Sequence, residues 1–77
     1  MKPEDWDILI DGLVFDNHIA KWGPYIFHIV PVMLDNQYLH VTVENQDYVV
    51  TSKQSCKTMT EARHRLVELV LILESSV

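Results

Sequence analysis

The sequence predicts a small α+β domain in which a helix, three antiparallel strands and a second helix follow in order (αβββα), with both helices on one sheet face. Three observations predict it. Apolar residues recur at helical spacing near the N-terminus, strand-forming residues fill the middle, and a strongly apolar helical pattern occupies residues 59–74. A chain of 77 residues, 48% of them hydrophobic, is expected to form one domain over residues 1–77.

Residues 4–20 are predicted to form the first helix, because Pro3 suits a first helical turn and the following apolar residues keep the helical period. These apolar residues are Trp6, Leu9, Ile10, Leu13 and Val14. An alternative stays open for residues 6–15. Asp11 and Gly12 lie between two apolar triplets, which is also the signature of a β-hairpin.

Three strands are predicted at residues 25–34, 37–44 and 47–53, where β-branched and aromatic residues are frequent. Each pair of strands is joined by a predicted two-residue turn, which fixes the register between them. The turns are at Asp35-Asn36 and Asn45-Gln46.

The resulting register places Val30 opposite Val41, and Val43 opposite Tyr48, and so divides the sheet into two faces. The face expected to carry the helices holds Ile26, Val30, Val32, Leu39, Val41, Val43, Tyr48 and Val50. The opposite face holds Phe27, Ile29, Met33, Tyr38, His40, Thr42 and Val49. This second face is too apolar for a solvated surface, so we expect it to form a homodimer or bind another protein. Its predicted interface residues are Phe27, Ile29, Met33, Tyr38 and His40.

The last helix is predicted to begin at a capping box, formed by Thr58 and by Glu61 three residues later. Its expected core stripe is Met59, Ala62, Leu66, Leu69, Val70 and Leu73. Val67 and Leu71 form a second apolar stripe, which is the other predicted interface for a homodimer or a partner.

The residue inventory predicts neither an enzyme nor a cofactor or metal site. The four histidines show no shared ligand spacing, and the single cysteine, Cys56, has no cysteine partner. The histidines are His18, His28, His40 and His64. A lone cysteine also favours a reducing compartment, and no apolar run is long enough to span a bilayer, so a cytoplasmic protein without membrane contact is expected.

The formal net charge of −5 opposes direct binding to nucleic-acid phosphates. Acidic residues concentrate in residues 1–20, where Glu4, Asp7 and Asp11 fall on the polar side of the predicted helix. We expect this acidic face to enter a basic groove on a nucleic-acid-binding protein. Its carboxylates would compete there with phosphates for the same lysines and arginines.

Residues 38–73 resemble the double-stranded RNA-binding domain, because HVTV, YVV and TEARHRL follow in that family's order. The family has the lysine-rich pattern K-K-x-A-K at the start of its last helix. This chain has MTEAR at residues 59–63 and matches the pattern at Ala62 and Arg63 only. The resemblance implies an alternative function, the binding of RNA through a basic patch. That patch consists of Lys53, Lys57, Arg63 and Arg65.

The same strands, followed by a T-x-x-E-A helix, also resemble the small HicB-type antitoxins, which pair with a toxin and often dimerise. In size, acidity and lack of a motif, the chain is similar to the small inhibitors that phages and mobile elements encode against host defences, including anti-CRISPR proteins. The hypothesis from the sequence is therefore a non-enzymatic regulator or inhibitor that blocks a nucleic-acid-binding partner through its acidic surface. The alternative is a module that binds RNA or a toxin.

Overall fold

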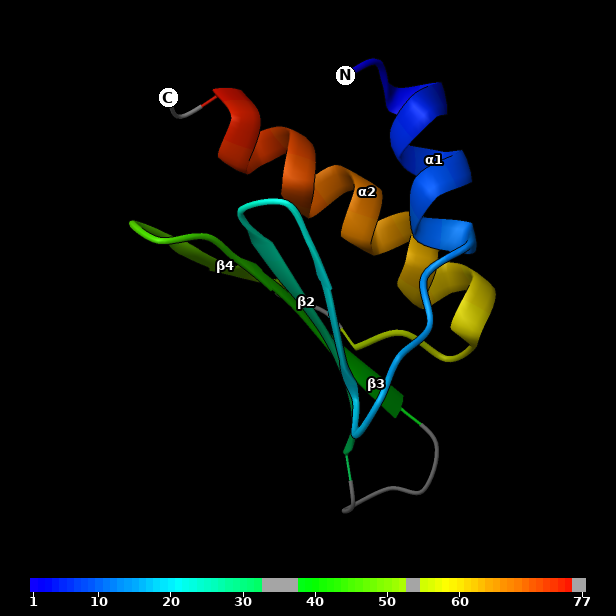
Figure 1. Cartoon of the computed structure of the whole chain (residues 1–77). Coiled ribbons are helices and arrows are strands. Elements are labelled where there is room, and N and C mark those ends of the chain that lie inside the picture. The colour runs from blue at the N-terminus through cyan, green and yellow to red at the C-terminus, as the bar shows by residue number, and fades with distance from the viewer. Residues whose placement is uncertain (33–37, 53–54, 76–77) are drawn as a thin grey trace.

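The computed structural model describes residues 1–32, 38–52 and 55–75 and has the predicted α+β class. Its elements are α1 (Pro3–Asp11), β1 (Ile19–Trp22), β2 (Tyr25–Val32), β3 (Tyr38–Glu44), β4 (Val49–Thr51) and α2 (Met59–Ser75). The strands form one antiparallel sheet in the order β1-β2-β3-β4, one strand more than the sequence predicted. Both helices lie on the same side of this sheet (Figure 1).

The first helix is shorter than predicted, because α1 ends at Asp11 rather than near residue 20. Gly12 caps it by donating its N–H to the carbonyls of Ile8 and Leu9, at 3.3 and 3.1 Å. The alternative hairpin over residues 6–15 is also wrong, since its first half is helical.

A tight turn over residues 16–19 reverses the chain into β1. Asp16 and Ile19 exchange both backbone hydrogen bonds, at 2.9 and 3.1 Å. Between them Asn17 and His18 have φ values of 54° and 70°, as a two-residue type I′ turn requires. Asparagine tolerates this conformation well, so Asn17 is the sequence signal that the helical prediction missed.

The hairpin turn between β1 and β2 gives a first testable prediction. Gly23 has a φ of +57°, and a Cβ built there would meet no atom within 4 Å. We therefore expect Gly23→Ala to lower the free energy of unfolding by about 1–2 kcal/mol through backbone strain alone. Gly12→Ala is the matched control, because Gly12 has a φ of −88° and its nearest neighbour would be 3.6 Å away. Urea unfolding measures both, and equal destabilisation would contradict the prediction.

The register between β2 and β3 differs by one residue from the predicted one. Val41 lies opposite Ile29 rather than Val30. The predicted turn at Asp35-Asn36 lies outside the described residues. A shift of one residue exchanges the two faces of a strand, and β2 is apolar on both faces, so alternation alone does not reveal the error.

The shift moves Phe27 and Ile29 from the predicted open face into the core, where they are 0% and 4% exposed. Ile26 and Val30 move to the open face instead. The register between β3 and β4 differs by two residues, which keeps the faces as predicted. The chain turns there at Asn45, whose Oδ1 accepts the backbone N–H groups of Asp47 and Tyr48 at 2.9 and 2.8 Å.

The last helix follows the prediction closely. Thr58 Oγ1 accepts the N–H of Glu61 at 3.0 Å, and Glu61 Oε2 accepts the N–H of Lys57 at 3.1 Å. Of the predicted core stripe only Met59 is exposed. The buried members are Ala62, Leu66, Leu69, Val70 and Leu73. They pack over β3 and β4, while α1 packs against the side of α2.

Candidate functional site

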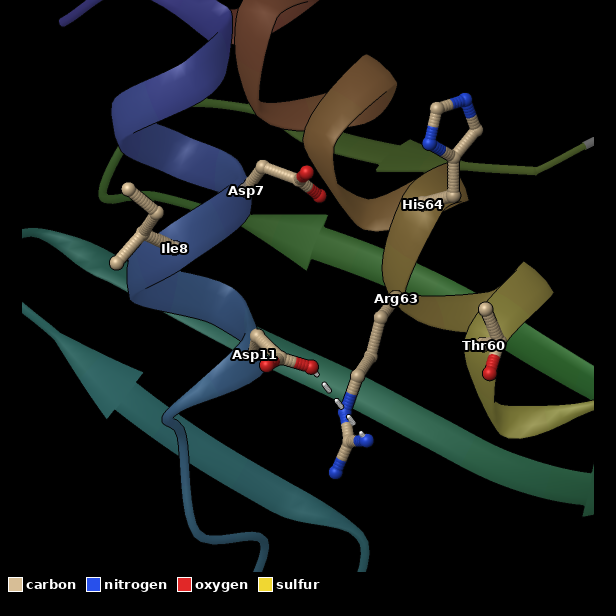
Figure 2. A pocket seen from close by; sticks show the side chains of 6 residues that line it. All are labelled: Asp7, Ile8, Asp11, Thr60, Arg63 and His64. Carbon is tan, nitrogen blue, oxygen red and sulfur yellow. Dashed lines mark ion pairs between the residues drawn. The ribbon is translucent and has the colours of Figure 1, made fainter.

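An open groove runs between α1 and α2, and Figure 2 shows its wider end. That end encloses about 380 Å³ and continues into a second hollow of about 200 Å³. The two hollows share Asp7 and His64, so they form one surface, which we call the interhelical groove. Its α1 side is lined by Pro3, Glu4, Asp7, Ile8 and Asp11. Its α2 side is lined by Thr60, Arg63, His64 and Val67.

The three carboxylates of the predicted acidic face all line this groove. Glu4, Asp7 and Asp11 are spaced by three and four residues, so they lie above one another on one face of α1. All three are exposed, while Trp6 and Ile10 turn into the core. The residues that we predicted to act together are therefore brought together.

The position of α1 is fixed by its one tryptophan. Trp6 donates its indole N–H to Glu74 Oε1 at 2.6 Å, and the N-terminal amine lies 3.2 Å from Oε2 of the same carboxylate. The indole ring is 1% exposed and meets Trp22 and Tyr25 edge to face, with ring centroids 5.4 and 5.5 Å apart. Burial, and then the nearby Glu74 charge, raise the pKa of Tyr25 above 10.0. These contacts tie α1 to both α2 and the sheet.

A single guanidinium faces the acidic wall. Arg63 extends from α2 toward Asp11, and its Nη1 lies 3.9 Å from the Asp11 Oδ1 (Figure 2). Its Nε is buried without a hydrogen-bond partner among the described residues. The exposed side chain of His64 lies near a carboxylate of its own helix, with Nε2 3.8 Å from Glu68 Oε1. Three carboxylates against one guanidinium leave the groove negative, which favours a cationic ligand group.

The alternative basic patch is largely neutralised by neighbouring carboxylates. Arg65 Nη1 lies 2.9 Å from Glu68 Oε2. The Glu68 charge raises the pKa of Arg65 above its ordinary value, and hydrogen bonding with Cys56 raises it further. Arg63 is turned toward the acidic helix, as described above. Lys57 has an exposed side chain, and Lys53 lies outside the described residues. The two arginines are thus oriented toward the protein's own carboxylates rather than toward a common phosphate-binding surface.

The predicted apolar interfaces are only partly at the surface. Phe27 and Ile29 are buried inside the domain rather than on the open face of the sheet, and Val67 is 6% exposed and lines the interhelical groove. The cause of this burial is the register for the first two, and packing beside α1 for Val67. Tyr38, His40 and Leu71 are half-buried, with the first two on the open face of the sheet. Met33 lies outside the described residues.

Within residues 1–32, 38–52 and 55–75, no group of three or more His, Cys, Asp or Glu side chains could hold a metal ion. Cys56 is fully buried beneath α2, next to Leu39, with which it shares two backbone hydrogen bonds. Neither helix in the described part of the chain is long and apolar enough to cross a membrane.

The sequence reasoning singled out Arg63 and Val67 for other roles, but it missed that they form the α2 wall of the groove together with Thr60 and His64. Thr60, Arg63, His64 and Val67 recur at spacings of three, one and three residues, which places them on one helical face. That pattern was visible in the sequence, but it does not say which other element the face would meet.

Comparison of the chain with protein-family models, with curated proteins and with solved structures gives no significant match.

Proposed function

We propose that the protein is a non-enzymatic binding module that occupies the basic surface of a nucleic-acid-binding protein through its interhelical groove. Lysine or arginine side chains of the partner would enter the groove and pair with Glu4, Asp7 and Asp11. The partner's nucleic-acid site would then be blocked, so the protein would act as a regulator or inhibitor, as phage-encoded anti-defence proteins do.

The observation that carries this proposal is the convergence of three exposed carboxylates on one groove, against one guanidinium. A chain with a formal net charge of −5 would also be attracted to a basic partner over several ångströms. The pairing of Arg63 and Arg65 with Asp11 and Glu68 supports a protein ligand over the alternative, an RNA ligand.

The test uses an arginine-rich peptide bound to fluorescently labelled duplex DNA as a stand-in for the partner. The wild-type protein is expected to release the DNA in a salt-dependent manner. Asp7→Lys combined with Asp11→Lys should weaken binding by about 2 kcal/mol or more, which is roughly 30-fold, because close charge pairs at interfaces reach this strength.

A charge-matched control separates the groove from the overall charge. Asp16→Lys combined with Asp47→Lys changes two exposed carboxylates that lie outside the groove. Each Asp→Lys substitution replaces a negative charge by a positive one and so raises the net charge by two units. Both double variants therefore take the formal net charge from −5 to −1. If the two variants lose affinity equally, long-range charge alone is responsible and the groove has no special role. Direct binding of the wild-type protein to duplex RNA would instead support the alternative.

A further inference from the structure

The outer side of β4 is an open sheet edge. Ser52 donates its N–H to the Val41 carbonyl at 3.0 Å, next to the paired strands. Because bonding alternates along an antiparallel ladder, the N–H and C=O groups of Val49 and Thr51 point away from β3. Within the described residues, β4 is the last strand of the sheet and pairs with β3 only.

The two edges of the sheet differ, because β1 is blocked by its turn and by a charge, whereas β4 is limited only by its length of three residues. On β1 the outward backbone groups of Ile19 are bonded to Asp16, and Lys21 adds a charge to the strand. Both features prevent edge-to-edge pairing in natural sheets. The residues of β4 are Val49, Val50 and Thr51, without charge or proline. An uncharged, largely apolar edge of this kind can accept another strand where a neighbouring surface adds to the contact.

A groove of about 430 Å³ lies beside this edge, between β4 and α2. Val50, Leu69 and Ile72 make it apolar, and Ile72 is 49% exposed. Arg65 and Glu68 line the same groove and lie 2.9 Å apart, so it carries both signs of charge. Of the nine exposed large apolar side chains among the described residues, three lie at this edge or groove. They are Tyr48, Val49 and Ile72.

We propose that a second copy of this chain pairs with this edge, β4 against β4 in antiparallel orientation, with the two α2 helices side by side across the seam. A two-fold axis brings the same surface of both copies together. Arg65 of one copy then faces Glu68 of the other, and the mixed charges of the groove become complementary. A stable interface buries roughly 800 Å² per partner, more than a three-residue strand supplies, so the α2 groove must contribute.

Light scattering over a dilution series tests the proposal, with a dimer expected for the wild-type protein. Thr51→Pro removes an outward N–H and leaves the backbone hydrogen bonds between β4 and β3 in place, although it also removes the hydroxyl that lies 3.3 Å from Thr42 Oγ1. Ile72→Glu puts a charge into the seam. Each change occurs twice in the dimer and should raise its dissociation constant by about tenfold or more. Val14→Glu is the control, because Val14 is 85% exposed and lies after α1, away from β4.

A charge-exchange experiment keeps the test independent of folding. Arg65→Glu gives a seam with only carboxylates at these two positions, and Glu68→Arg gives one with only guanidiniums. Each variant alone should be largely monomeric because like charges meet across the axis. An equimolar mixture of the two should form heterodimers, which a simple loss of stability would not produce.

Hydrogen exchange supplies the direct readout, since the amides of Val49 and Thr51 should exchange more slowly as the protein concentration rises. A wild-type protein that stays monomeric at its highest soluble concentration overturns the proposal. A dimer that is insensitive to Thr51→Pro and Ile72→Glu overturns it as well, because that dimer uses another surface. Because β4 and the interhelical groove lie on different parts of the molecule, neither result affects the proposed function.

Discussion

Replacement of Trp6 by alanine is expected to lower the free energy of unfolding by about 3–5 kcal/mol. A chain of 77 residues has a total stability of roughly 4–12 kcal/mol, at about 0.05–0.15 kcal/mol per residue, so this loss would remove a large share of that stability. The cause is the loss of a fully buried ring that meets Trp22 and Tyr25 edge to face and anchors α1. Trp6 and Ile10 are the two buried residues of α1, so the substitution removes the larger of the helix's two buried anchors.

Trp6→Phe separates the two parts of this effect, because it keeps an aromatic ring and removes the hydrogen bond to Glu74. That bond runs to a charged acceptor, so its loss should cost about 1–3 kcal/mol, clearly less than the alanine variant. Urea unfolding followed by far-UV circular dichroism is the appropriate measurement, since two tryptophans contribute to the fluorescence. A Trp6→Ala variant as stable as the wild type would show that α1 is held by other contacts.

The last helix could be predicted from the sequence because its signals agree and are local. Thr58 and Glu61 mark its start, and the apolar period of 3.6 residues continues from there without interruption. Such signals depend only on residues within one or two turns of each other. The same holds for the acidic face, since Glu4, Asp7 and Asp11 lie within α1 and needed only a helix to align them.

The extent of the first helix could not be predicted in the same way, because the apolar residues after Asp11 keep a helical period by coincidence. Leu13 is half-buried while Val14 is exposed, so the pattern continues past the point where the helix has ended. The decisive residue was Asn17, which adopts positive φ in the following turn. It was visible in the sequence, but its weight depends on a strand, β1, that only pairing with β2 stabilises.

The candidate groove was half predictable for a related reason. A helix defines its own faces, so one wall followed from α1 alone. The second wall requires knowing that the face of α2 with Arg63 and His64 lies against α1, which is set by Trp6 and Glu74 at the far ends of the chain. Contacts between residues 68 positions apart leave no local pattern in the sequence.

The register of β2 leads to a second substitution with a large expected effect on stability. Phe27→Ala is expected to lower the free energy of unfolding by about 3–5 kcal/mol, because Phe27 is 0% exposed and faces the helices. Its neighbour Ile26 lies on the open face and is half-buried, so Ile26→Ala should cost no more than about 1 kcal/mol. The two residues are adjacent in one strand and both large and apolar, which makes them a matched pair.

The predicted register with Val30 opposite Val41 requires the reverse order, with Ile26 in the core and Phe27 on the open face. Urea unfolding of the two variants therefore measures the register directly, without a structure of either one. A greater loss for Ile26→Ala than for Phe27→Ala would contradict the pairing of Ile29 with Val41. The stability difference should also persist at any protein concentration, because Phe27 lies in the core of one chain and meets the aromatic side chain of Trp6 there, rather than a second copy.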